Sequence, residues 1–150
     1  MKKYLFIGLM ALMAWVFTGC ERNEPFHKKT VDLVVKQSNW DFDNKANMFF
    51  CHFDVPEITE QVYNYGEISV NREYNSGKNN AYQVALPETT YKMEEELNDA
   101  GEVVNTFYYQ QHIDYAVGVG FVEVFCTISD FFYPADWTPE AMLFRLQLTY

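Results

Sequence analysis

The feature that most constrains the fold is the alternation of side chains along the last nine residues, "MLFRLQLTY". Every second residue from Phe144 to Tyr150 is apolar, and the residues between them are Arg145, Gln147 and Thr149. Side chains of a β-strand point alternately to its two faces, so this period places all the apolar groups on one face. A segment of this kind is typical of a strand that covers a core on one side, and we expect it to be docked in a sheet.

Six earlier segments share this character, being alternating or rich in β-branched and aromatic residues, as strands are. They are residues 30–36, 48–55, 67–74, 81–86, 103–117 and 120–129. The sequences "NSGKNN" at 75–80 and "NDAG" at 98–101 have the composition of hairpin loops. About seven or eight short strands joined in this way predict an all-β fold, an antiparallel β-sandwich, with a small β-barrel as the alternative.

One short helical turn is expected in the segment 56–66, "PEITEQVYNYG". Thr59 is a suitable N-cap because its hydroxyl can accept from the free amides of a first turn. Gly66 is suited to end the turn. No internal repeat is evident, so the segment interrupts a chain that is otherwise made of strands.

The N-terminus has the organisation of an export signal. Lys2 and Lys3 precede an apolar run from Tyr4 to Phe17, which at 14 residues is shorter than the ~20 needed to cross a bilayer. The run ends in Thr18, Gly19 and Cys20, after which the sequence becomes polar. Residues 1–19 are therefore predicted to be a signal peptide, residues 20–29 a tether, and residues 30–150 the β-sandwich domain.

The residues "TGC" at 18–20 resemble the lipobox of bacterial lipoproteins, with Phe17 where leucine is usual. The resemblance implies that the Cys20 thiol is lipidated and that cleavage makes Cys20 the first mature residue. It also implies a membrane partner held through that covalent lipid. Glu21 stands where an aspartate would favour the inner membrane, so the outer membrane is the expected location. The periplasmic and cell-surface faces both stay open.

The lipobox, together with "FDVPEIT", "YNYG" and "FRLQLTY", is similar to a class of small outer-membrane lipoproteins of gut Gram-negative anaerobes. That resemblance implies a compact β domain and supplies neither an activity nor functional residues. Lys2 and Lys3 would leave with the signal, so the mature chain would keep 21 acidic and nine basic residues, a net charge of −12. A charge of this sign repels phosphate backbones, so nucleic acid is not an expected partner. The run Glu94–Glu96 is interpreted as a solvated flank of a turn.

Cys51 and Cys126 both lie inside strand-like segments. An exported location permits a disulfide between them. Two buried free thiols acting as small apolar groups fit the sequence at least as well. Neither a Cys-x-x-Cys pair nor zinc-type Cys/His spacing is present in the sequence.

Acidic residues raise three questions of chemistry. Glycoside hydrolysis needs two facing carboxylates, and the candidates are Asp54, Asp114 and Glu123. A metal site could be formed by Glu123 with the histidines His52 and His112. The loop "WDFDNKAN" has oxygen ligands at alternate positions, as calcium sites do, but its pattern is incomplete. We expect no cofactor and no catalytic residue, and ordinary surface groups and a plain turn explain these positions better.

Aromatic residues are the stronger lead. The loop "DFFYPADWTPE" contains Phe131, Tyr133 and Trp137, and Tyr65 follows the helical turn. Flat rings on loops can stack on sugars or anchor a protein partner, although rings in long loops often fold back to fill a core.

These features favour a lipid-anchored envelope protein, a non-catalytic binding or accessory module for a glycan or an envelope protein. The first alternative is a structural or assembly lipoprotein with no small ligand, in which Trp137 would be buried. The second is an envelope glycan hydrolase, which requires a cleft with two facing carboxylates.

Overall fold

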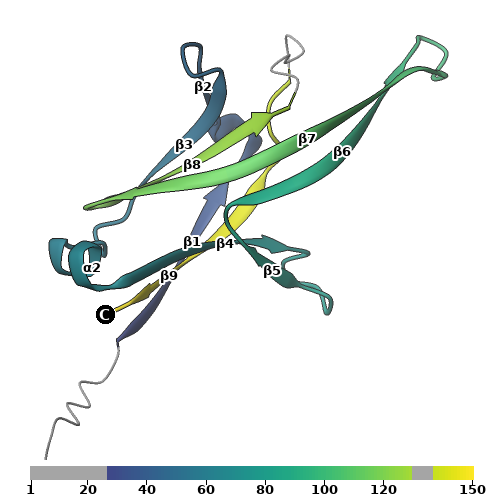
Figure 1. The fold of residues 1–150 in the computed structure, drawn as a ribbon. Helices are drawn as coiled ribbons and strands as arrows, with labels where there is room; N and C mark the ends of the chain where they lie inside the picture. Colours follow the sequence, from purple (N-terminus) through teal and green to yellow (C-terminus); the bar gives the residue numbers. More distant parts are fainter. Residues whose placement is uncertain (1–26, 130–136) are drawn as a thin grey trace, which may run out of the picture.

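The computed structural model describes residues 27–129 and 137–150, which form two antiparallel sheets packed face to face (Figure 1). Sheet A contains four strands in the order β1 (Lys28–Val35), β9 (Met142–Thr149), β4 (Glu67–Tyr74) and β5 (Tyr82–Ala85). Sheet B contains five in the order β2 (Asp41–Asp43), β3 (Met48–Asp54), β8 (Phe121–Ile128), β7 (Val103–Gly118) and β6 (Glu88–Leu97). Two short helices, η1 (Gln37–Asn39) and α2 (Glu60–Tyr65), complete the described part.

The predicted antiparallel β-sandwich is confirmed. The two sheets remain separate in the described ranges, so the small-barrel alternative is wrong. Nine strands are present there, where the sequence predicted seven or eight. The additional strands are β2 and β6, neither of which has an apolar face pattern.

The first strand begins earlier than predicted. Lys28 and Lys29 were assigned to the tether, but they pair with Thr149 and Leu148 in sheet A. His27 extends the ladder, since its amide and carbonyl bond the carbonyl and amide of Tyr150 at 2.8 and 3.0 Å. The sandwich domain therefore includes residues 27–29.

The core lies between the apolar faces of the central strands, β9 of sheet A and β8 of sheet B. Phe144, Leu146 and Leu148 of β9 are fully buried, as are Val122 and Val124 of β8. These are the alternating apolar residues that predicted the two strands. The predicted docking of the C-terminal strand is confirmed, because β9 lies between β1 and β4.

The helical turn forms as predicted. The Thr59 hydroxyl accepts from the amide of Val62 at 3.3 Å, and Gly66 ends the helix by donating to the Val62 carbonyl at 2.9 Å. Gly66 is required here by crowding. A Cβ at this position would lie 2.6 Å from the Val62 carbonyl oxygen and 2.9 Å from that of Thr149. Any side chain would therefore separate α2 from the end of β9.

Strands β6 and β7 form a long hairpin that extends beyond sheet B (Figure 1). The predicted loop 98–101 closes it, with the Asn98 carboxamide oxygen accepting from the amides of Ala100 and Glu102, both at 2.9 Å. The interpretation of Glu94–Glu96 as a solvated flank of a turn is confirmed, because all three are exposed at the end of β6, just before the loop 98–101. All three residues pair with residues of β7 in the ladder. They are exposed because strand β8 pairs only with the residues of β7 from Gln111 onward.

The candidate disulfide is not formed, because Cys51 and Cys126 are both free and buried. Cys51 pairs with Val124 and Cys126 pairs with Phe49, so the cysteines are diagonal neighbours on the inner face of sheet B. Diagonal positions lie ~7–8 Å apart, beyond the Cα separation that a disulfide bridges without backbone movement.

We expect neither buried thiol to react with Ellman's reagent in the native state of a Cys20→Ser variant. Burial raises the pKa of the Cys126 thiol to about 12 and also raises that of Cys51, so the reactive thiolate is scarce at neutral pH. Adding denaturant should release two thiols per chain. Rapid labelling of either cysteine without denaturant would contradict this placement.

Candidate functional site

The inner faces of the two sheets are apolar on one side of the sandwich and polar on the other. On the polar side, strand β6 contributes Glu88, Thr90, Lys92 and Glu94, which alternate with outward-facing residues. Arg72 of β4 lies on the same inner face as Val70, and is only 4% exposed. Charged groups are rarely buried without a partner, so the contacts of these residues are informative.

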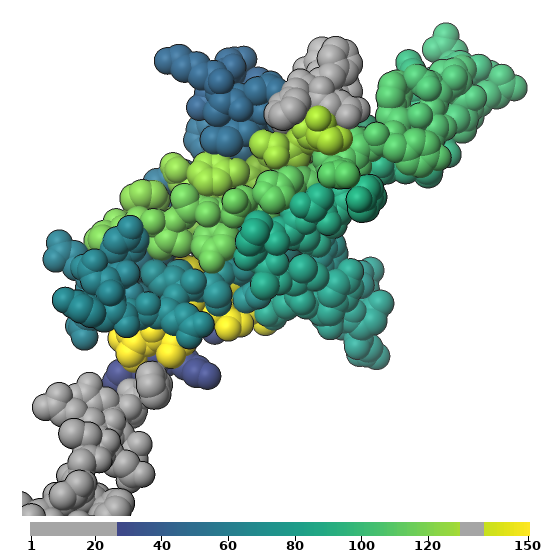
Figure 2. Space-filling view, in the orientation of Figure 1, coloured from purple at the N-terminus to yellow at the C-terminus, as the bar shows by residue number. Residues whose placement is uncertain are grey.

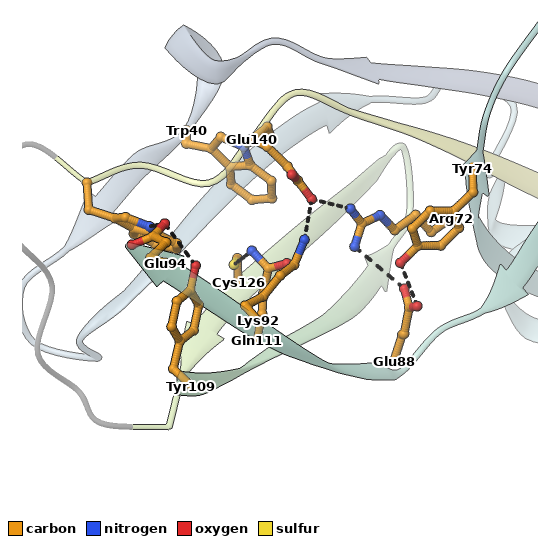
Figure 3. Close-up of polar contacts among 11 residues, drawn as sticks. Trp40, Arg72, Tyr74, Glu88, Lys92, Glu94, Tyr109, Gln111, Cys126 and Glu140 are labelled. Atoms are coloured by element: carbon orange, nitrogen blue, oxygen red, sulfur yellow. Dashed lines mark hydrogen bonds and ion pairs between the residues drawn. The ribbon is translucent and has the colours of Figure 1, made fainter. Parts of the chain in front are cut away.

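Glu140, in the segment before β9, connects the two sheets. One oxygen of its carboxylate accepts from Arg72 Nη2 at 2.6 Å and from Lys92 Nζ at 2.9 Å (Figure 3). Its backbone carbonyl accepts from the indole N–H of the buried Trp40 at 3.1 Å. Burial alone would raise the pKa of Glu140, but Lys92 and Arg72 outweigh that and hold the pKa below its ordinary value. The carboxylate is thus held ionised between two cations.

Arg72 is enclosed by a second set of contacts. Its guanidinium lies 4.4 Å from the centre of the Tyr74 ring, and its Nη1 lies 3.7 Å from a carboxylate oxygen of Glu88. The Tyr74 hydroxyl donates to the other oxygen of Glu88 at 2.6 Å (Figure 3). A fixed guanidinium of this kind is a rigid wall of the intersheet space.

Beside this network lies a groove of about 490 Å³, lined by residues of β6, β7, η1 and the segment before β9. Trp137 and Tyr109 contribute rings to its wall, in an edge-on contact with ring centres 6.2 Å apart. Both donate to the same oxygen of Glu94 at 3.1 Å, the former through its indole N–H and the latter through its hydroxyl. Burial, together with Glu94, raises the Tyr109 pKa to about 12, so the hydroxyl remains a donor.

Gln111 of β7 lines the groove and is only 2% exposed. Its amide nitrogen donates to the Cys126 sulfur at 3.6 Å, a weak acceptor, and its carbonyl oxygen has no hydrogen-bond partner within residues 27–129 and 137–150. The hydroxyl of Thr90, which pairs with Gln111 across the two strands, also has none. Buried polar atoms are nearly always bonded, so these two require a partner from outside the described residues, and water or a ligand can supply one.

The groove therefore combines aromatic rings, a buried amide and fixed charges in a volume typical of small-molecule sites. Comparisons with family models, curated proteins and solved structures find no match to this chain. Within the part of the chain that the structure describes, no helix is long and apolar enough to cross a membrane. Any function must accordingly be argued from the groove and the surface themselves.

The structure places one of the sequence-predicted binding residues in the groove. Trp137 lines it and is partly buried, with its ring packed against the hydrophobic core at Phe49. Tyr65 is 87% exposed on α2, beside the end of β9 at Thr149, and therefore lies at the opposite end of the sandwich. Phe131, Tyr133 and the predicted lipidation residue Cys20 lie outside the described residues.

The carboxylates proposed for hydrolysis lie elsewhere. Asp54, Asp114 and Glu123 all occupy the outer face of sheet B, on adjacent strands. His52 on that face contacts Glu123 at 3.1 Å and Asp54 at 3.5 Å, and its ring stacks on Phe121. His112 contacts the hydroxyl of Thr89 instead, so the two histidines and Glu123 do not converge. No group of three metal-ligating side chains of the His, Cys, Asp and Glu types occurs among the described residues.

We expect the pKa of His52 to lie above its ordinary value of about 6.5. The hydrogen bond with Glu123 raises it, burial opposes this only partly, and Asp54 adds to the rise. The stabilising effect of the pair is complete below pH ~6.5 and is lost as the pH rises through the folded-state pKa. An NMR titration of the imidazole should show that Glu123→Gln lowers this pKa, and that Glu60→Gln leaves it unchanged. An unaltered His52 titration in Glu123→Gln would contradict the contact.

The loop with calcium-like oxygen spacing, residues 40–47, comprises strand β2 and a turn between β2 and β3. The Asp43 carboxylate accepts from the amides of Lys45 and Ala46 at 2.7 and 3.2 Å, so one of its oxygens serves the backbone. Asn47 takes a left-handed conformation, with φ of 50°, as turn asparagines do.

Most residues of the groove and of the adjoining ion-pair network were not identified from the sequence. Arg72 shares its strand face with Ile68 and Val70, and Gln111 shares its face with Ile113. The sequence signal for such a residue is a polar side chain at an alternate position of a strand whose other alternate positions are apolar. Lys92 and Glu140 gave none, because neither lies in an alternating apolar segment.

Proposed function

We propose that this protein is a lipid-anchored envelope binding module that holds a neutral saccharide segment in the groove between its sheets. Its lipid would be attached to Cys20, in the outer membrane. The observation that supports a ligand most directly is the buried carbonyl oxygen of Gln111, a residue that lines the groove, because this oxygen has no hydrogen-bond partner among the described residues. A sugar hydroxyl is a suitable donor to such an acceptor.

The other groove contents suit a saccharide. Trp137 and Tyr109 provide ring surface against which the C–H face of a sugar can pack. Glu94 and Glu140 offer acceptors, and Lys92 offers a donor. The charges of the region, with Glu88 and Arg72, sum to −1, and the chain as a whole is acidic. An uncharged polyhydroxylated ligand therefore fits better than an acidic one.

Binding without hydrolysis is favoured by the state of Glu140. A glycosidase needs a general acid whose pKa is raised, so that it keeps its proton near neutral pH. Arg72 and Lys92 instead hold the pKa of Glu140 below its ordinary value. Glu94 accepts two hydrogen bonds, which occupies one of its oxygens with structural contacts.

A glycan array probed with the purified protein tests the groove. We expect neutral saccharides to be retained, with binding at least about tenfold weaker in Trp137→Ala and in Gln111→Leu, because each removes a wall contact or an acceptor. Tyr65→Ala is the matched control, since it removes an exposed ring at the other end of the sandwich. Circular dichroism checks that each variant is folded. The absence of saccharide binding, or equal losses in Tyr65→Ala, would overturn the proposal.

The anchor has its own test. Cys20→Ser should move the protein from the detergent-soluble lipid phase to the aqueous phase when cells are fractionated, because no acyl chain could be attached. Protease treatment of intact cells would then distinguish the cell-surface face from the periplasmic face for the unaltered chain. A Cys20→Ser protein that still partitions with lipid would remove the anchor from the proposal and leave the groove untouched.

A further inference from the structure

The outer half of the β6–β7 hairpin, residues 91–110, ends in a tip that projects from the rest of the molecule, and we call this half the arm (Figure 2). Strand β6 pairs only with β7 in the described ranges, so it is the edge of sheet B. It is ten residues long, and the backbone groups that face away from β7 can accept a further strand. A long, regular edge of this kind is what natural proteins usually protect.

The outward face of the arm is apolar next to that edge. Tyr91 is 83% exposed, and Met93 pairs directly with Tyr108, these two being 55% and 73% exposed. More apolar residues lie toward the tip, where Leu97, Val103 and Val104 are each more than half exposed. Exposed apolar residues are ordinary when scattered, but a group of them along one free edge indicates an interaction surface.

The charges of the arm indicate which partner suits it. Glu94, Glu95, Glu96, Asp99 and Glu102 are all exposed, and the one basic residue, Lys92, is already bonded to Glu140. Because side chains alternate along β6, Glu95 shares the outward face with Tyr91 and Met93, while Glu94 and Glu96 point to the opposite face. A second copy of this acidic chain would be repelled, and a basic segment would be attracted.

We propose that the edge of β6 binds an extended basic peptide segment, in which lysine or arginine alternates with apolar residues, as an added antiparallel or parallel strand. Main-chain hydrogen bonds to β6 hold such a segment, and alternate side chains give specificity. Its apolar residues cover Tyr91, Met93 and Tyr108 on the outward face. Its basic residues alternate with them and lie on the opposite face, beside Glu94 and Glu96. This site shares Met93 and Glu94 with the lining of the groove, but it uses the free edge of β6 and does not depend on saccharide binding.

The test uses the full chain and three synthetic seven-residue peptides, measured by fluorescence anisotropy. The first alternates lysine and valine, the second alternates glutamate and valine, and the third is the first with alternate backbone nitrogens methylated. We expect the lysine peptide to bind, the glutamate peptide not to bind, and methylation to weaken binding at least about tenfold, because methylated nitrogens cannot donate to β6.

Two arm variants locate the site. Glu95→Lys/Glu96→Lys should weaken binding of the lysine peptide at least about tenfold by charge repulsion, and Tyr91→Ser/Tyr108→Ser should weaken it through lost apolar contact. The matched controls are Glu60→Lys/Glu67→Lys, which makes the same charge change near α2, and Tyr65→Ser. Saccharide binding should be unchanged in both arm variants, which separates this site from the groove.

Four results would each overturn the proposal. Two concern the peptides: equal binding of the lysine and glutamate peptides, or equal binding of the methylated and unmethylated lysine peptides. The third is an effect of Glu60→Lys/Glu67→Lys as large as that of Glu95→Lys/Glu96→Lys. The fourth is a concentration-dependent dimer of the chain that Tyr91→Ser/Tyr108→Ser abolishes. The last would assign the edge to a second copy of this chain.

Discussion

Replacing Phe144 by alanine is expected to lower the free energy of unfolding by about 3–5 kcal/mol. Phe144 is fully buried in β9, the strand between β1 and β4, where it pairs with Leu33 and Arg72. The substitution removes a large ring from a position packed on both sides, and the neighbouring strands are fixed by two ladders. These strands cannot collapse into the space, so the free-energy cost of a cavity adds to the hydrophobic transfer free energy that is lost with the ring.

Urea unfolding followed by circular dichroism measures this effect, with Phe107→Ala as the matched control. Phe107 lies in the arm and is 49% exposed, so the same chemical change should cost less than about 1 kcal/mol there. A loss in Phe144→Ala that is no larger than that in Phe107→Ala would mean that β9 does not occupy the centre of the core. The slope of the urea dependence should stay the same in both variants.

Most of the strands that the sequence predicted have one buried face, β5 being an exception. In β8 and β9 every second residue is buried, so the burial period equals the strand period and is visible in the residue types. Strand β6 forms without that signal. Its outer half is exposed on both faces, and it is held by its ladder to β7, which no property of "YKMEEEL" itself encodes.

The candidate site could be predicted from the sequence only in part, for a related reason. Trp137 could be chosen because a large ring in a loop is informative by itself. The prediction that Trp137 and Tyr65 belong to one binding surface failed because the two residues lie at opposite ends of β9. Trp137 precedes the first residue of that strand, and Tyr65 lies near its last residue. Lys92 and Glu140 meet because residues 48 positions apart come from facing parts of the sandwich. A contact of this kind depends on the pairing of the sheets.

Replacing Arg72 by methionine is expected to lower the free energy of unfolding by about 3 kcal/mol, although methionine keeps most of the side-chain length. Removing one partner of a buried ion pair leaves the other charge unbalanced, which costs more than the pair itself contributes. The Glu88 carboxylate is only 9% exposed, and its second oxygen has no hydrogen bond even with Arg72 present. In the variant it would keep the Tyr74 hydroxyl as its donor and lose its only cation within 4 Å among the described residues.

The reason for this cost can be separated from a packing defect by a second substitution. If the unbalanced charge is responsible, Arg72→Met/Glu88→Gln should regain at least about half of the lost stability, because glutamine keeps the bond to Tyr74 without a charge. Lys29→Met is the control for loss of an ion pair in water. Its partner Glu57 lies at 3.1 Å on the surface, and the expected cost is below about 1 kcal/mol. Equal losses in Arg72→Met and Lys29→Met, or no recovery in the double variant, would show that Arg72 does not balance a buried carboxylate.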